Sequence, residues 1–196
     1  MSQFHTRLQA KDLINVGIFT AIYFILYFVT MMIAYIPIFI LVLGFLCPIV
    51  CGIPMMLYYT KVRQFGMITL MGTILGLTML AMGSGVLVLI AGVICGLAAD
   101  LIMKAGRYSN WRLMALSYAV FSLWTMGYYS RLFFTRDAFL DSLVAGYGRE
   151  YAETIAALTP SWSYAALALS CVVGGLLGAW LGRAVLKKHF VKAGIV

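Results

Sequence analysis

Long uncharged apolar runs, separated by short polar or glycine-containing breaks, make up most of the chain. A transmembrane helix needs about 20 mostly apolar residues, and residues 13–34 form one uncharged stretch of that kind. Residues 64–99 also carry no charge, but as a single helix they would be about 54 Å long, well beyond a hydrocarbon core of about 30 Å. The Gly83-Ser84-Gly85 sequence in their middle therefore predicts a turn.

This pattern predicts an all-α polytopic membrane protein, a bundle of six transmembrane helices within one domain, residues 1–196. Tyr35-Ile36-Pro37 marks the first break, because proline removes a backbone donor and biases the preceding residue away from helix. Residues 135–160 are polar and mixed, which indicates an ordered outer loop. The predicted helices cover residues 13–34, 38–59, 66–82, 86–103, 113–130 and 162–182.

The composition indicates that most of the protein surface is in contact with lipid and not with water. Hydrophobic residues make up 64% of the chain and charged residues only 10%, with a mean hydropathy of +1.00. A soluble domain carries about 25% charged residues. We therefore expect a multi-pass protein in contact with the lipid bilayer, with no soluble domain of its own.

The basic residues predict the orientation of the helices. With the N-terminus in the cytoplasm, the outer segments hold only Arg131, Arg136 and Arg149. The other eleven lie in inner segments, which gives a strong positive-inside bias and places both termini in the cytoplasm: Arg7, Lys11, Lys61, Arg63, Lys104, Arg107, Arg112, Arg183, Lys187, Lys188 and Lys192. The net charge of +8 therefore reports topology and anionic lipid, and we expect no nucleic-acid partner.

Sequence motifs typical of ATP-hydrolysing proteins and zinc enzymes are missing from the chain. It contains neither a GxxxxGK[ST] phosphate loop nor an HExxH motif, and both histidines, His5 and His189, fall in the basic ends. We therefore expect no catalytic residue, no bound metal, no cofactor and no enzymatic activity. Asp100 is the one acid within a predicted helix, and it is interpreted either as an ion pair with Lys104 one turn later or as a coupling residue.

Small residues recur four positions apart on several helices. Such rows share one helix face and let a second helix approach closely. We expect three of them to pack inside the bundle: Gly72 with Gly76, Gly92 with Gly96, and Gly174 with Gly178 and Gly182. The first helix carries a further pair, Gly17 and Ala21.

Aromatic residues gather towards the predicted outer surface. One interpretation is an aromatic belt at the lipid interface. The other is a pocket with aromatic walls and an arginine for an acidic group. The residues predicted to bind substrate are Tyr35, Trp124, Tyr128, Arg131, Trp162 and Tyr164.

At family level the chain resembles the substrate-binding S components of energy-coupling factor (ECF) transporters, and among them the MptD (Trep-Strep) type. The matching segments are Lys11-Asp12-Leu13, Gly17-Ile18-Phe19-Thr20-Ala21, Ala99-Asp100-Leu101-Ile102 and the ending from Lys187 to Ile195. The resemblance implies a transmembrane coupling protein and two ATPase subunits as partners, in a bacterial plasma membrane. It also implies that an Ala-x-x-x-Ala face on the first helix docks the coupling protein, although Gly17 here replaces the first alanine.

The predicted function is therefore the substrate-specific subunit of an ATP-driven importer. Its cargo would be a vitamin-like or other micronutrient bound near the outer surface, and the aromatic pocket favours a flat ring system, such as haem. Two alternatives remain: a self-sufficient secondary carrier, or a membrane assembly protein without cargo. Apart from Asp100 the predicted helices carry no carboxylate, which disfavours an ion-driven carrier.

Overall fold

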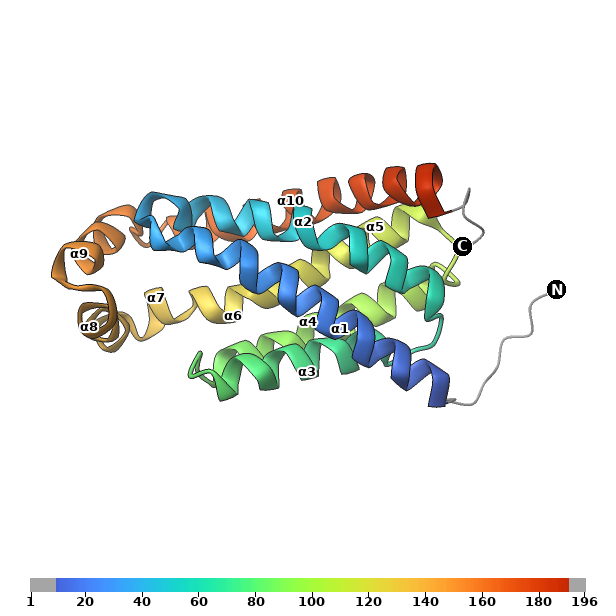
Figure 1. The fold of residues 1–196 in the computed structure, drawn as a ribbon, viewed down its shortest axis with the longest axis horizontal. Coiled ribbons are helices and arrows are strands. Elements are labelled where there is room, and N and C mark those ends of the chain that lie inside the picture. The colour runs from blue at the N-terminus through green and yellow to red at the C-terminus, as the bar shows by residue number, and fades with distance from the viewer. Residues whose placement is uncertain (1–9, 191–196) are drawn as a thin grey trace.

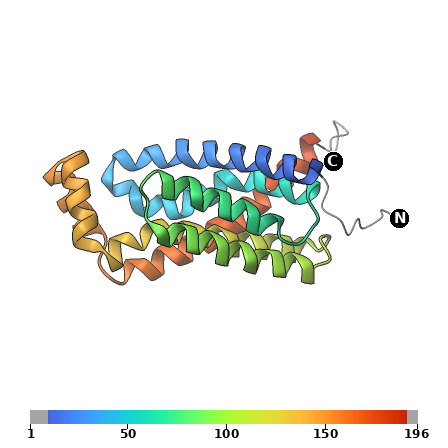
Figure 2. The ribbon, with the colours of Figure 1, turned by 90° about the horizontal axis from the view of Figure 1, so that it is seen from below.

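The computed structural model describes residues 10–190, and these residues are helical, without a strand among them. The long helices run alternately up and down one axis (Figure 1). At one end, the cap end, two short helices, α8 (Arg136–Tyr147) and α9 (Arg149–Leu158), lie across the axis (Figure 2). At the other, the tail end, α1 (Ala10–Met31) begins and α10 (Ser163–Val185) ends.

The first helical pair is broken where the sequence predicts. Helix α1 is followed by the 3-10 turns η1 (Met32–Tyr35) and η2 (Pro37–Phe39), and α2 covers Ile40–Lys61. Ile36 between the two turns is extended, with φ −97° and ψ 111°, as expected for a residue before proline. The predicted Pro37 break is confirmed.

The second pair is α3 (Met67–Ala81) and α4 (Val86–Ala105), joined at the predicted Gly-Ser-Gly turn. Gly83 and Gly85 both have φ near +83°, a left-handed conformation that glycine adopts without steric cost. With 15 residues, α3 is about 22 Å long at 1.5 Å per residue. It is therefore shorter than a hydrocarbon core of about 30 Å.

The segment predicted as one helix at residues 113–130 is divided. It consists of α5 (Trp111–Phe121), the 3-10 turn η3 (Ser122–Thr125), α6 (Met126–Tyr129) and α7 (Arg131–Phe134). The predicted outer loop at 135–160 is ordered but helical, because it forms α8 and α9. Helix α10 continues into a π-helical turn at Leu186–Phe190.

Four helical segments within residues 10–190 are long and apolar enough to cross a membrane: Ala10–Tyr35, Pro37–Lys61, Val86–Ala105 and Ser163–Lys188. The chain is thus an all-helical membrane protein. The short α3 and the divided α5–α7 segment run alongside these four (Figures 1 and 2). The predicted cytoplasmic termini, residues 1–9 and 191–196, lie outside the described residues.

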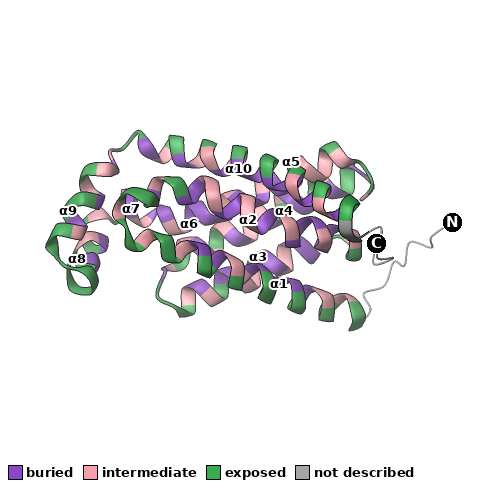
Figure 3. Ribbon diagram, turned by 45° about the horizontal axis from the view of Figure 1, so that its top comes forward, coloured by how far each residue is buried: buried purple, intermediate pink, exposed green. Residues whose placement is uncertain are grey.

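Small residues bring the long helices into close contact, as predicted. A methyl group added to Gly178 would collide with the backbone of Pro48, and one added to Gly174 would collide with Phe45. Gly72 of α3 and Gly92 of α4 likewise face each other's backbone. The buried hydrophobic residues form two clusters, with Tyr128 packed against both, while the outward faces carry many exposed apolar residues (Figure 3).

Asp100 caps a helix instead of pairing with Lys104. Its fully buried carboxylate accepts hydrogen bonds from the Thr69 amide (2.8 Å), the Thr69 hydroxyl (2.6 Å) and the Ile68 amide (3.3 Å). The first N–H groups of a helix lack partners within it. The Ile68 and Thr69 amides belong to the first turn of α3. Lys104 lies over the ring of Phe65, with its Nζ 5.2 Å from the centroid.

Candidate functional site

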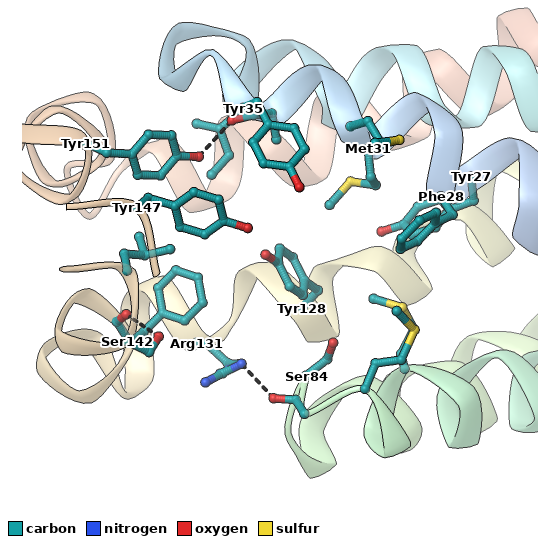
Figure 4. Close-up of a pocket in the computed structure, with 18 residues that line it drawn as sticks. Tyr27, Phe28, Met31, Tyr35, Ser84, Tyr128, Arg131, Ser142, Tyr147 and Tyr151 are labelled. Atoms are coloured by element: carbon teal, nitrogen blue, oxygen red, sulfur yellow. Dashed lines mark hydrogen bonds between the residues drawn. The ribbon is translucent and has the colours of Figure 1, made fainter. Parts of the chain in front are cut away.

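A cavity of about 360 Å³ opens at the cap end. It lies between the ends of α1 and η1, the α3–α4 turn, the α6–α7 segment and the two cap helices (Figure 4). Its volume falls near the lower end of the range for small-molecule sites. The lining residues are Tyr27, Phe28, Met31, Met32, Ala34, Tyr35, Ile40, Met79, Met82, Gly83, Ser84, Tyr128, Arg131, Phe139, Ser142, Leu143, Tyr147 and Tyr151.

Tyr27 lines the cavity on the side away from the cap helices (Figure 4). Its side chain is 1% exposed, and its ring packs on that of Trp124 with centroids 5.0 Å apart. Its hydroxyl oxygen is buried without a hydrogen-bond partner among the described residues. Buried polar groups are nearly always paired in folded proteins, so this hydroxyl is an exception that needs a reason.

Arg131 supplies a positive charge at the side of the cavity. Its Nη1 donates to the Gly83 carbonyl at 2.9 Å, and its guanidinium lies 4.9 Å from the centroid of the Phe139 ring. A carbonyl and a ring face orient the guanidinium but carry no formal negative charge. The guanidinium fork therefore keeps the capacity to bind a carboxylate.

Three tyrosines close the cavity: Tyr147 and Tyr151 from the cap helices, and Tyr35 from η1. The Tyr151 hydroxyl donates to the Ala34 carbonyl at 2.7 Å, which ties α9 to η1. The Tyr147 ring stacks on that of Tyr151 with centroids 4.9 Å apart, and it meets the Tyr35 ring edge-on at 5.8 Å. The hydroxyls of Tyr35, Tyr128 and Tyr147 point into the same space as that of Tyr27 (Figure 4).

Arg136 holds the cap in place. Its guanidinium donates to the carbonyls of Thr159 (2.7 Å), Ala156 (2.7 Å) and Leu132 (3.2 Å). These contacts join the end of α9 to α7, which itself carries Arg131. The cap helices are thus held against the wall of the cavity by these hydrogen bonds.

The structure brings three of the predicted substrate-binding residues together, because Tyr35, Tyr128 and Arg131 all line the cavity. The other three lie elsewhere. Trp124 is fully buried beneath Tyr27, and its Nε1 donates to the Tyr23 hydroxyl at 3.2 Å. Trp162 is 72% exposed, as an interfacial anchor would be. Tyr164 shares a hydrogen bond of 2.9 Å with Ser130 and packs on Phe133 and Phe134.

Other lining residues were not predicted. Tyr27 lies about one turn before the end of α1, and nothing in its local sequence separates it from the other buried tyrosines. Four methionines, Met31, Met32, Met79 and Met82, also face the cavity. Their positions at the outer ends of the first and third predicted helices could have indicated this, since those ends lie on the same side of an antiparallel bundle.

A metal site has no support in the described part of the chain. No group of three or more histidine, cysteine or acidic side chains there could hold a metal ion. The cysteines Cys47, Cys51 and Cys171 are buried, and Cys95 is partly buried. The cavity can bind an organic molecule through rings, hydroxyls and one arginine.

The small-residue face of α1 is the other feature of interest. Gly17 and Ala21 are exposed, and a methyl group added to Gly17 would meet nothing within 4 Å. Exposed isoleucines flank the pair, Ile14 at 60% and Ile18 at 52%. Unlike the glycine rows of α2–α4 and α10, this row is not covered by another helix within residues 10–190.

Comparison with known proteins gives one family. Residues 10–192 match the family described as "Hypothetical bacterial integral membrane protein (Trep_Strep)". No curated protein matches the chain, and no solved structure matches it either. The match covers all the helices described above.

Proposed function

The chain belongs to the Trep_Strep family of bacterial integral membrane proteins, and from that premise we propose that it is the substrate-binding subunit of an ATP-driven importer of the energy-coupling factor type. It would lie in the bacterial plasma membrane with six spans and both termini in the cytoplasm. Its partners would be a transmembrane coupling protein and two ATPase subunits. The chain itself would perform no catalysis.

The observation that carries this proposal is the cavity at the cap end. It is closed by tyrosines, floored by Tyr27 and flanked by Arg131. With the basic residues on the cytoplasmic side, the cap end faces outward, where an importer must capture its cargo. The sequence carries no phosphate-binding loop, so energy for release would come from a partner.

The substrate class follows from the lining. Aromatic and thioether side chains favour the faces of a flat ring, and Arg131 favours an acidic substituent. A vitamin-like molecule or other micronutrient with a ring and a carboxylate fits these groups.

The face around Gly17 and Ala21 is the proposed docking surface for a helix of the coupling protein. Glycine and alanine one turn apart let a second helix approach closely within a membrane. The small-residue rows of α3, α4 and α10, which were predicted to pack inside the bundle, are each covered by another helix of this chain. The row of Gly17 and Ala21 instead faces outward from the described bundle.

Co-expression with the coupling protein and the two ATPases tests the docking surface. Gly17→Leu should abolish co-purification and uptake while the purified subunit still binds substrate. Gly146→Leu is the matched control, because Gly146 also has nothing within 4 Å; it should assemble normally. Normal uptake by Gly17→Leu would contradict the docking assignment, and gradient-driven uptake into liposomes by this chain alone would favour the carrier.

Labelling of single cysteines in intact cells tests the topology. Glu153 on α9 and Lys187 after α10 are both exposed. A membrane-impermeant thiol reagent should label Glu153→Cys but not Lys187→Cys. The reverse pattern would place the cavity on the cytoplasmic side and remove the basis for an importer.

A further inference from the structure

We infer that Tyr27 recognises an uncharged hydrogen-bond acceptor on the innermost edge of the substrate, while Arg131 binds an acidic group at the other end. This inference rests on the proposed substrate-binding function and narrows the substrate to a flat molecule with two different polar ends. Tyr27 is then the residue that separates the cargo from a ring of the same shape without that acceptor.

The argument begins with the cost of an unpaired hydroxyl. A buried polar group that gives up water without gaining a partner destabilises the fold. Three other buried tyrosines in this structure avoid that cost. Tyr118 donates to the Pro48 carbonyl (2.5 Å), Tyr58 donates to the Met67 carbonyl (2.8 Å), and Tyr59 bonds to Ser117 (2.9 Å).

Tyr27 differs from these residues in its position as well as its bonding. It lines the cavity, and its hydroxyl faces the space between the two walls (Figure 4). A phenylalanine would fill the same volume at this place without leaving a polar atom unpaired. A bound ligand that offers an acceptor would complete the hydrogen bond only when the site is occupied.

The surroundings decide the charge of that acceptor. Tyr27 rests on the Trp124 ring, and Phe28, Met31 and Met79 line the cavity with it. A charged group placed among such side chains would lose its hydration without an opposite charge nearby. A ring nitrogen or carbonyl oxygen carries a smaller desolvation cost, and a tyrosine hydroxyl can donate to either.

The other end of the cavity has the opposite character. Arg131 belongs to α7, close to the α3–α4 turn whose Gly83 carbonyl it contacts. Figure 4 places it apart from Tyr27, with Tyr128 between them. The ring of the substrate would thus lie between the methionine and tyrosine walls, with its acidic group towards Arg131.

The first test needs no ligand. Tyr27→Phe should raise the melting temperature of the empty protein in detergent by about 2–4 °C, because it removes an unpaired buried hydroxyl. Tyr118→Phe is the control; it should lower the melting temperature, because it breaks a satisfied bond. A lower melting temperature for Tyr27→Phe would mean that the hydroxyl is already paired, which would overturn the inference.

The second test uses an isosteric pair of probes, quinoline-6-carboxylate and 2-naphthoate, which differ by one ring nitrogen far from the acid. Binding can be followed by tryptophan fluorescence, since Trp124 packs on Tyr27. The wild type should bind the quinoline about tenfold more tightly, and Tyr27→Phe should bind both equally. Arg131→Gln should weaken both probes to the same extent.

The outcomes separate this inference from the function beneath it. Equal binding of both probes by the wild type, or a preference that survives Tyr27→Phe, would overturn the role of Tyr27 and leave a substrate-binding cavity. Binding of neither probe would count against the flat aromatic acid and so against the substrate class itself.

Discussion

The two ends of the bundle differ in how their helices pack. Towards the tail end, small residues let backbones touch: Gly52 of α2 faces Gly178 of α10, and Gly96 of α4 faces Thr69 of α3. At the cap end Gly127 of α6 still meets the backbone of Val88 of α4, but large side chains also line a cavity of about 360 Å³ there. Where the helices touch there is no room for a ligand, and where they separate the walls are tyrosine, methionine and arginine.

This difference separates stability from binding within one chain. Close helix packing stabilises a membrane bundle through van der Waals contact, since lipid offers little hydrophobic drive between helices. At the cap end the cavity replaces part of this packing, and the buried Tyr27 hydroxyl has no hydrogen-bond partner among the described residues. Substitutions should therefore act on folding at the tail end and on ligand binding at the cap end.

The largest effect is expected from Gly178→Ala. The new methyl group would overlap the Pro48 carbonyl, and because it meets backbone, the cost should reach about 3 kcal/mol, the upper end for overpacking. Gly17→Ala makes the same change on an open face and should stabilise the helix by up to about 1 kcal/mol. Chemical denaturation in detergent measures both, and an equally tolerated Gly178→Ala would refute the close packing.

Asp100→Ala should come next, at about 2–3 kcal/mol, because the charged acceptor of three hydrogen bonds at the start of α3 is lost. Asp100→Asn keeps one acceptor oxygen and should cost less. Lys104→Ala is the control for the ion pair and should change stability by less than about 0.5 kcal/mol. An equal loss of stability in the lysine and aspartate variants would support the Asp100–Lys104 ion pair instead.

Arg136→Gln should loosen the cap without unfolding the bundle. Three carbonyls would lose a charged donor, at a local cost of about 1.5 kcal/mol. Limited proteolysis of intact cells should then cut α8 or α9 faster than in the wild type. Arg149→Gln, at an exposed position of the same cap, should leave the cleavage rate unchanged.

The smallest effect is expected from Tyr151→Phe, which removes only the hydrogen bond to Ala34. The loss should be about 1 kcal/mol, and a bound ligand should dissociate several-fold faster while associating at a similar rate. Burial raises the pKa of the Tyr151 phenol above its ordinary value, so the donor stays protonated at neutral pH. Unchanged dissociation would mean that the cap does not open at this contact.

The sequence predicted the helical segments well because each depends on local information. Proline at position 37 and the Gly-Ser-Gly turn at 83–85 act on the backbone at the place where they occur. The glycine rows were predicted correctly for the same reason, since four-residue spacing places them on one face. The division of residues 113–130 was not predicted, because no proline or glycine marks its break at Ser122–Thr125.

The site was only partly readable. Tyr35, Tyr128 and Arg131 lie near the outer ends of predicted helices. Their predicted depth in the membrane was enough to place them at the level of the cavity. Depth cannot say which way a ring points, and so Trp124, Trp162 and Tyr164 lie outside the lining. The cap was read as a loop, because its polar composition hides the short helices that close the cavity.

The sequence by itself determined that this chain is a helical membrane protein. Segments that cross lipid must be long, apolar and internally hydrogen-bonded, and the apolar composition shows this directly. It also determined which helix faces can approach closely. Only the tertiary structure decided that Asp100 caps α3 and that the Tyr27 hydroxyl lies at a cavity without a hydrogen-bond partner among residues 10–190. Hydrogen-bond partners come from other helices, and distance along the chain does not reveal which helix will supply them.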